Sequence, residues 1–375
     1  MIEIDSVRSD FPALNQQVYG KDLVYLDNAA TTLKPSAVLK RLVDFYSTIN
    51  SNVHRGSHYL SDQASIAYER ARERVREFIN ASSPEEIIFT GGTTESINLT
   101  AATFGRTFVK KGDEILSTRM EHHSNIVPWQ RICREKGAEL KVIPVDAAGN
   151  LTMDEFNELI SNKTKLVALT YVSSVLGTIN PVREICRIAH KKDIPVLIDG
   201  AQAPQHLPID VRDLDCDFFA FSGHKVYAGT GIGVLYGKKR WLDAMEPYQS
   251  GGGMITSVSF ENTSYEDIPL KFEAGTGNIA GALGLESAIK YLEKTGIENI
   301  AAHEKSLTDY ALKKLNKIEG ARVYGNSEER CGVISFNLEG IHHQDLGAVL
   351  DKLGIAVRTG RLCAAVVRPV GAPAS

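Results

Sequence analysis

The chain has 375 residues, of which 43% are hydrophobic and 23% charged, a balance typical of globular proteins. This length is enough for one large domain, a smaller one and a sizeable core. The formal net charge of −4 gives no electrostatic reason to expect nucleic acid, and no basic run suggests a membrane surface. The start is charged and lacks a long apolar segment, so we do not expect a signal peptide.

The cysteines are scattered singly, with no CxxC pair, which argues against a disulfide framework and against a structural zinc site. We therefore expect a cytoplasmic protein with reduced thiols, in which the first four cysteines are small buried apolar residues. Nothing in the chain has metal-ligand spacing, so we predict no metal site and interpret IHHQD (341–345) as a solvated loop. The five cysteines are Cys133, Cys186, Cys216, Cys331 and Cys363.

Short apolar runs alternate with longer helical patterns through the first two thirds of the chain. Strand–helix alternation predicts an α/β fold with a mostly parallel sheet and helices on both faces. The strands are almost continuously apolar, as expected when both faces of a sheet are covered. In chain order the predicted strands are 86–91, 113–118, 140–145, 165–172, 194–199, 217–223 and 232–237, with helical segments at 95–108, 125–137, 152–161 and 182–192.

The pattern changes near residue 285. A long amphipathic stretch, broken at Thr295-Gly296, is followed by CGVISFNL (331–338), a helix-like HHQDLGAVLDKLG (342–354) and IAVRTG (355–360). We interpret this as a smaller α+β domain. The predicted division is a large domain at 20–285 and a small domain formed by 1–19 and 286–375, with its C-terminal part truncated.

Polar side chains close two of the predicted strands. Asp199 ends the strand 194–199, and Ser222, His224 and Lys225 lie at the end of the strand 217–223. Ligand sites in parallel sheets collect at the carboxyl ends of strands. Pyridoxal phosphate requires a lysine for its Schiff base and a carboxylate that keeps its pyridine nitrogen protonated. A structural salt bridge is the alternative, and the pair alone leaves both open.

The segment GGTTES (91–96) follows a predicted strand and opens a helix, an arrangement that lets free backbone N–H groups bind a phosphate. A helix with glycines in its first turn is the structural alternative. GTGIG (229–233) leads into a strand, so we reject it as a nucleotide motif. In MEHHSN (120–125), adjacent histidines on an extended stretch point opposite ways, so only one of His122 and His123 can face a ligand.

Together these segments resemble the class V aminotransferase group of pyridoxal phosphate enzymes. The ending RTGRLC (358–363) is similar to that of the group II cysteine desulfurases and selenocysteine lyases of the SUF iron–sulfur system. The resemblance runs from residue 1 to about 364 and implies a fold type I transferase with a seven-stranded sheet. Its motifs are YLDNAATT (25–32), NVHRGSHYLS (52–61), GGTTESINL (91–99), EHHSN (121–125), DGAQ (199–202), SGHK (222–225) and FEAGTGN (272–278).

The resemblance also implies roles. Lys225 matches the Schiff-base lysine, Asp199 the partner of the pyridine nitrogen, and His122 the ring-stacking, catalytic histidine. Gln202 matches a donor to the phenolic oxygen of the cofactor. The implied phosphate ligands are Thr93, Thr94, Ser222, His224 and, across a dimer interface, Thr276; the implied substrate contacts are Ala29, His54, Ser174 and Arg358.

Cys363 matches the thiol that attacks the sulfur of L-cysteine or the selenium of L-selenocysteine. The family's reaction gives alanine and a persulfide on that thiol, which a SUF acceptor protein receives. The nucleophile needs to be a partly exposed thiolate, which a loop after a strand can supply. The resemblance thus implies a cytoplasmic homodimer that serves iron–sulfur cluster assembly.

Some positions depart from the family. Arg361-Leu362 replace two histidines, Ser174 replaces an asparagine, and nothing after Ala364 matches, including the arginine that clamps the substrate carboxylate. We therefore expect a truncated or frame-shifted chain with impaired turnover. The alternatives are another class V lyase or aminotransferase-like enzyme, in which Cys363 is incidental, and an inactive paralogue that still binds the cofactor.

Overall fold

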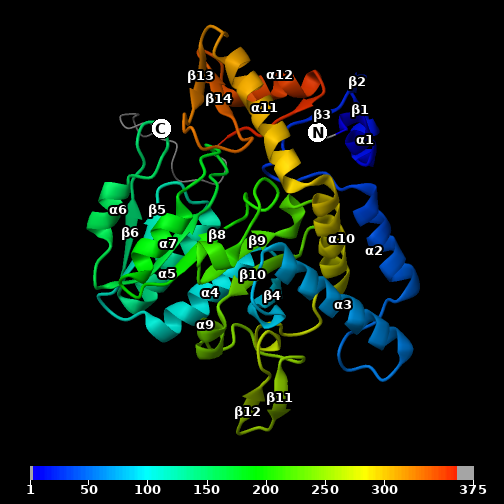
Figure 1. Ribbon diagram of the computed structural model, residues 1–375, viewed down its shortest axis with the longest axis vertical. Coiled ribbons are helices and arrows are strands. Elements are labelled where there is room, and N and C mark those ends of the chain that lie inside the picture. Colours follow the sequence, from blue (N-terminus) through cyan, green and yellow to red (C-terminus); the bar gives the residue numbers. More distant parts are fainter. Residues whose placement is uncertain (1–2, 361–375) are drawn as a thin grey trace.

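The structure, a computed structural model, describes residues 3–360 and is built around a seven-stranded sheet with helices on both faces (Figure 1). The strand order is β4-β10-β9-β8-β7-β5-β6. All neighbours are parallel except β10, which is antiparallel to both β4 and β9. The strands are β4 (Ile87–Thr90), β5 (Glu114–Thr118), β6 (Glu139–Ile143), β7 (Thr164–Thr170), β8 (Val196–Asp199), β9 (Phe218–Ser222) and β10 (Gly233–Gly237).

This architecture confirms the predicted α/β fold class and all seven predicted strands. Alternate residues of each strand contribute to two separate apolar cores, one on each face. Phe218 of β9 faces the core beneath α4, for example, whereas Phe219 faces the opposite core. One core contains side chains of α4 (Thr93–Phe108), α5 (Val127–Lys136) and α9 (Lys239–Ala244); the other contains side chains of α2 (Ser36–Thr48), α3 (Tyr59–Phe78), α6 (Met153–Leu159), α7 (Val182–His190), α8 (Val211–Leu214) and α10 (Ile279–Thr295).

The predicted break in the long amphipathic stretch is confirmed. Helix α10 ends at Thr295 and α11 (Ile297–Leu315) begins two residues later, because Gly296 adopts a left-handed φ of 85°. Short two-stranded sheets surround the main one, and β15 runs parallel to β3. The remaining elements are α1 (Ile4–Ser9), β1 (Gln17–Val18), β2 (Lys21–Asp22), β3 (Val24–Tyr25), β11 (Ile255–Val258), β12 (Thr263–Tyr265), β13 (Ala321–Tyr324), β14 (Ser335–Leu338), α12 (His343–Lys352), β15 (Ile355–Ala356) and five 3₁₀ turns, η1 (Pro12–Asn15), η2 (Pro84–Glu86), η3 (His123–Asn125), η4 (Gly223–Lys225) and η5 (Leu270–Phe272).

The division into two domains stays a prediction. Elements β13, β14, α11 and α12 lie together at one end of the molecule, beside β1–β3 and α1 (Figure 1). The predicted boundary at residue 20 falls inside the β1–β2 hairpin, and β3 pairs with β15. We propose that the N-terminal part of the smaller unit extends at least to Tyr25.

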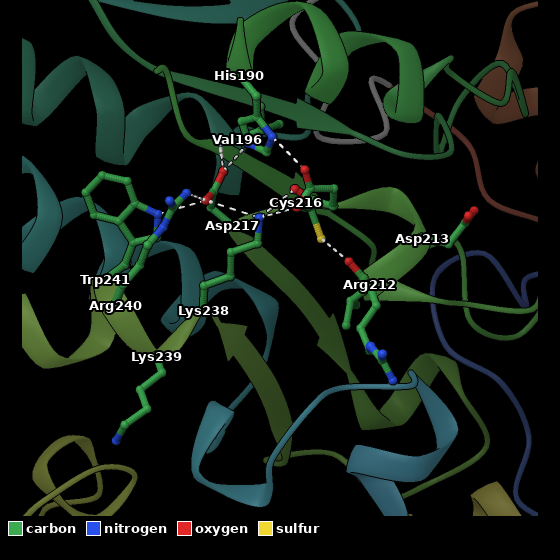
Figure 2. Close-up of polar contacts among 12 residues, drawn as sticks. His190, Val196, Arg212, Asp213, Cys216, Asp217, Lys238, Lys239, Arg240 and Trp241 are labelled. Atoms are coloured by element: carbon green, nitrogen blue, oxygen red, sulfur yellow. Dashed lines mark hydrogen bonds and ion pairs between the residues drawn. The ribbon is translucent and has the colours of Figure 1, made fainter. Parts of the chain in front are cut away.

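A cluster of charged side chains joins α7 to β8 and β9 at the end of the sheet opposite Asp199. Figure 2 shows these side chains converging on Asp217, whose carboxylate is fully buried. His190 lies 2.7 Å from Asp217 through Nε2 and 2.9 Å from Asp215 through Nδ1. An imidazole that bonds two carboxylates through both nitrogens donates from both, so it carries a positive charge. Asp217 also accepts hydrogen bonds from the Val196 N–H, from Arg240 and from Trp241.

The first four cysteines are buried and unpaired, which confirms their predicted role as small apolar residues; Cys363 lies outside the described residues. The interpretation of IHHQD as a loop was wrong, because His342 caps α12 and His343 is its first residue. No helix within residues 3–360 has the length and apolar character needed to cross a bilayer. Within that same range, no cluster of three or more histidine, cysteine, aspartate or glutamate side chains could hold a metal ion.

Candidate active site

The site is built on the carboxyl ends of β8 and β9, where Asp199 and Lys225 are brought together. Asp199 is the last residue of β8 and is 3% exposed, and half-buried Lys225 ends the turn η4 directly after β9. Burial raises the pKa of Asp199, whereas the Ala201 N–H bond (3.0 Å to Oδ1) and the charge of Lys225 lower it. The buried carboxylate of Asp199 can therefore pair with a second positive charge besides that of Lys225.

The turn that carries Lys225 is held by the N-terminal segment 31–34. The carbonyl oxygen of His224 accepts hydrogen bonds from the Thr32 N–H (3.1 Å), the Thr32 hydroxyl (3.0 Å) and Lys34 Nζ (2.9 Å). Burial lowers the pKa of Lys34 to about 8. Burial, Lys225 and Lys34 together lower the pKa of His224 to about 4, so this imidazole is neutral at pH 7. The roles of Thr32 and Lys34 were missed from sequence, because they depend on a contact across 190 residues.

The N-terminus of α4 faces the end of β9. The Thr93 N–H donates to Ser222 Oγ at 2.8 Å, and the two hydroxyls lie 2.7 Å apart. Gly92 at the N-cap has no side chain to satisfy the first turn of the helix, whose N–H groups favour an anion. Thr93 and Ser222 are buried, whereas Thr94 is exposed. The structure therefore brings three of the predicted phosphate ligands to this region: Thr93, Ser222 and His224.

His122 lies after β5 and is half-buried, and exposed His123 beside it is the first residue of η3. Its Nδ1 accepts from the Ser124 N–H at 3.2 Å and lies 2.7 Å from the Ser124 hydroxyl. Nδ1 is therefore the acceptor, and the proton of the neutral ring is on Nε2. Burial, with smaller contributions from Lys225 and His123, lowers the pKa of His122 to about 4. A neutral ring can stack on an aromatic cofactor without a charge to desolvate.

Gln202 is buried and is bonded to Ala29, another predicted site residue. Its Nε2 donates to the carbonyl oxygen of Ala29, and its Oε1 accepts from Gln205 Nε2 at 3.0 Å. The amide carries two hydrogens, so one remains for the predicted bond to a phenolic oxygen. The contact uses the backbone carbonyl of Ala29. The side chain of Ala29 therefore could not indicate this contact in the sequence.

The other predicted substrate contacts are more dispersed. Arg358 is paired with Asp27, and exposed His54 lies 3.5 Å from Glu69 Oε1 and has a left-handed φ of 70°. Ser174 is half-buried in the loop after β7. Thr276 is exposed, and its predicted contact lies across a dimer interface. These assignments stay predictions.

A surface hollow of about 460 Å³ opens at the start of α7 and contains none of the predicted site residues. It is lined by Tyr171, Ile179, Asn180, Pro181, Val182, Arg183, Glu184 and Arg187. Most of its side chains are apolar or already paired, as Arg183 is with Asp213. The chemistry of the molecule lies at the strand ends instead.

The residues at the strand ends fit a phosphate-bearing aromatic cofactor. The chemistry of the donors matches the two ends of such a molecule: hydroxyl groups and a helix N-terminus for a phosphate, and a buried carboxylate for a ring nitrogen. Gly92 has a φ of 153°, which L side chains rarely adopt, so the turn where the phosphate would bind favours glycine at this position. The lysine, carboxylate and histidine come from three different strand ends.

Comparison with known proteins supports this arrangement. The model of the class-V aminotransferase family matches residues 24–373. A cysteine desulfurase of Synechococcus elongatus is 51% identical over 362 residues, covering 96% of this chain and 58% of the relative. A probable cysteine desulfurase of Halalkalibacterium halodurans is 52% identical over 358 residues, covering 96% of this chain and 88% of the relative. The chain therefore spans little more than half the length of the first relative and most of the second.

A solved structure has the same fold. The apo cysteine desulfurase of Thermococcus onnurineus superposes with a TM-score of 0.92 at 40% identity, covering 97% of this chain and 89% of that one. The likeness extends over both the main sheet and the smaller elements at its end, since almost the whole chain is covered.

Proposed function

Because this chain belongs to the class-V aminotransferase family and, within it, to the cysteine desulfurases, we propose that it is a pyridoxal phosphate-dependent enzyme that converts L-cysteine to L-alanine and places the sulfur on Cys363. The single observation that carries the proposal is the juxtaposition of Asp199 and Lys225. The two side chains come from neighbouring strand ends, and the charge of Lys225 acts on a carboxylate that is 3% exposed.

Each residue contributes a distinct step. The cofactor, when bound, withdraws electrons from the α-carbon of an attached amino acid. Asp199 would hold the positive charge of the ring nitrogen, and neutral His122 would cover the ring. Lys225 would anchor the cofactor and would serve as the base that takes the α-proton of the substrate and can return it. Thr93, Ser222 and His224 would bind the phosphate through hydroxyl, N–H and imidazole donors.

The sulfur-transfer step belongs to Cys363. Its thiolate attacks the sulfur of the substrate, a new S–S bond forms, and the carbon–sulfur bond of the substrate breaks and leaves its electrons on the alanine skeleton. We propose a protein acceptor for the resulting persulfide, a cytoplasmic role in iron–sulfur cluster assembly, and selenocysteine as a second substrate. Each of these proposals follows from the family and from the position of Cys363 after RTG.

A homodimer is part of the proposal, because Thr276 would complete the phosphate site of a partner subunit. Its support is an exposed apolar surface on α2 and α3, where large side chains would otherwise be left in water. These side chains are Leu39, Val43, Tyr46, Tyr59, Leu60 and Ile66. Sedimentation of the purified protein would measure the association directly.

The test is a single-turnover assay of cofactor-loaded protein with L-cysteine. We expect one alanine and one protein-bound persulfide per active site, with no persulfide in Cys363→Ala. Lys225→Ala should bind the cofactor without the visible absorbance of a lysine adduct. Cofactor binding without alanine would contradict the desulfurase proposal and favour an inactive paralogue, whereas alanine formed independently of Cys363 would favour a different class V lyase.

A further inference from the structure

Glu121 is a fully buried carboxyl that the proposed reaction does not use. It follows β5, directly precedes His122 and is 0% exposed. Within residues 3–360 no basic side chain pairs with it. Its partners are hydrogen-bond donors from three segments: the Thr118 hydroxyl at 2.6 Å and the Thr170 N–H at 2.9 Å, both to Oε1, and Asn125 Nδ2 at 2.6 Å to Oε2. Burying a carboxyl costs free energy, so its retention needs an explanation.

On one side this network reaches Asp199. Thr170 is the last residue of β7 and is the register partner of Asp199 in β8. The N–H of the next residue, Tyr171, donates to the carbonyl oxygen of Asp199 at 2.9 Å. By accepting the Thr170 N–H, Glu121 fixes the point where β7 ends beside the carboxylate that would hold the ring nitrogen.

On the other side the network reaches His122. Asn125 closes the turn η3 by donating its backbone N–H to the carbonyl oxygen of His122 at 2.8 Å, while its side chain donates to Glu121. The amide of Asn125 is itself oriented by Trp129 Nε1, which donates to its Oδ1 at 2.9 Å. The position of the His122 backbone is therefore set by the same carboxyl that sets the end of β7.

We propose that Glu121 is a positioning residue for the cofactor. Its buried carboxyl fixes His122, which would cover the ring, relative to the end of β7, which lies beside Asp199, the proposed partner of the ring nitrogen. This inference rests on the proposed function, because it names the same cofactor. It assigns Glu121 no contact with substrate or cofactor.

The ionisation of Glu121 adds a measurable signature. Burial raises its pKa to about 8, the three donated hydrogen bonds oppose this, and the charge of Asp199 raises it further. Raising the pH from 7 to 9 therefore increases the negative charge beside Asp199 and His122, towards the ionised form that all three donors fit. The spectrum of bound cofactor should respond to that charge in the native protein.

The experiment compares Glu121→Gln with the native protein. Glutamine is neutral at every pH and can still accept the Thr170 N–H, but its amide opposes the amide of Asn125 and disturbs the link to His122. We expect the dissociation constant for pyridoxal phosphate to rise about tenfold. We also expect the change in visible absorbance between pH 7 and 9 to disappear, with the melting temperature of the cofactor-free protein within a few degrees of native.

Glu86→Gln is the matched control, because Glu86 is also buried and accepts only backbone N–H groups, those of Ser82, Ser83 and Lys239, at the start of β4. It should leave cofactor affinity and spectrum unchanged. If Glu121→Gln fails to fold, Thr118→Val removes one donor and should weaken affinity severalfold. The inference would be overturned if the variant that folds, Glu121→Gln or Thr118→Val, binds the cofactor with native affinity and shows the native pH response. It would also be overturned if Glu86→Gln changed affinity and spectrum as much as Glu121→Gln does.

These outcomes are separable from failure of the proposed function. If the native protein does not bind pyridoxal phosphate at all, the proposed function fails, and the inference falls with it. If the native protein binds the cofactor and makes alanine while the Glu121 variants match it in affinity and spectrum, only the positioning role is wrong.

Discussion

Arg358 and Asp27, which are 331 residues apart in sequence, form a two-pronged ion pair: Nε lies 3.0 Å from Oδ1 and Nη2 lies 2.7 Å from Oδ2. The pair lies beside the β15–β3 pairing, so the segment that leads to Cys363 is fastened to the segment that contains Ala29. Arg358 is 54% exposed on its side chain. Because two parallel hydrogen bonds join the groups, Asp27 fixes the orientation of the planar guanidinium of Arg358 as well as balancing its charge.

We predict that Arg358→Lys raises KM for L-cysteine about tenfold, roughly 1.4 kcal/mol, with little change in cofactor affinity, because lysine keeps the charge but not the fork. Steady-state kinetics of the loaded enzyme would measure it. Asp27→Asn is the control that keeps the arginine and loosens its orientation, and it should raise KM less. An unchanged KM in Arg358→Lys would remove Arg358 from the substrate site.

A buried ion pair that ties the FEAGTGN segment (272–278) to α3 should dominate local stability. Arg72 is 1% exposed and bonds Glu273 through Nη1 at 2.6 Å and Nη2 at 3.0 Å. Glu273 also accepts the Phe89 N–H at 2.7 Å. We predict that Glu273→Gln lowers the free energy of unfolding by about 3 kcal/mol, because it leaves the buried guanidinium with the half-exposed Glu69, 3.0 Å from Nε, as its remaining counter-charge.

Urea denaturation would measure this loss, and the double variant Arg72→Met with Glu273→Gln would provide the control. Removing both charges should restore part of the lost stability, since no uncompensated charge then remains. Additive losses in the two single variants would show that the pair is not coupled.

His190 predicts a specific pH dependence of stability. Hydrogen bonding to Asp217, opposed by burial and helped by Asp215, raises its pKa above the ordinary value near 6.5. A raised pKa contributes stability that is fully present below about pH 6.5 and is lost as the pH rises through the folded-state value. His190→Gln should therefore cost about 1.5–3 kcal/mol at pH 6 and less at pH 9.

Thermal melts of both proteins at the two pH values would check the prediction. Asp215→Asn is the control, because that carboxylate is largely exposed, contacts His190 through Nδ1 and also pairs with Lys238, so its loss should change the pH dependence less. If the melting temperatures of native protein and His190→Gln differ by the same amount at pH 6 and at pH 9, the imidazole is not charged in the folded state.

Lys34 should change the stability with pH in the direction opposite to His190. Because burial lowers its pKa to about 8, the unfolded chain binds more protons than the folded one between pH 8 and about 10.4. Stability therefore rises with pH in that window through this group. Lys34→Met should flatten the rise, measured as the difference in melting temperature from native between pH 8 and 10, and an unchanged difference would contradict it.

The central sheet was predictable because each of its strands is an apolar run with both faces covered. The antiparallel direction of β10 was not, because direction depends on neighbours and not on the pattern within Gly233–Gly237. Helices α2 and α3 were missed. The strands of the β1–β2 and β11–β12 hairpins were missed too, since two to four largely exposed residues carry no usable alternation, whereas β14 lies within the segment CGVISFNL that the sequence assigned to the α+β unit.

In the site, Asp199, Ser222 and Lys225 were found because polar residues that directly follow apolar strands are conspicuous. Glu121 was visible in the sequence, but its meaning depends on Thr170, 49 residues away. Lys34 acquires its low pKa only when the segment 31–34 packs over His224. Such residues are ordinary in sequence and become special through tertiary contacts.

The close backbone contact between Gly92 and Gly233 limits which positions of this protein could be changed in engineering. A methyl group on Gly233 would lie 2.4 Å from Gly92 Cα, so the reversed strand β10 and the N-cap of α4 are in contact with no room between them. Libraries that enlarge either residue would displace the helix start and discard folded, cofactor-competent members. A new substrate range is better sought at Ser174 itself, which is half-buried, whereas its neighbours Ser173 and Val175 are buried.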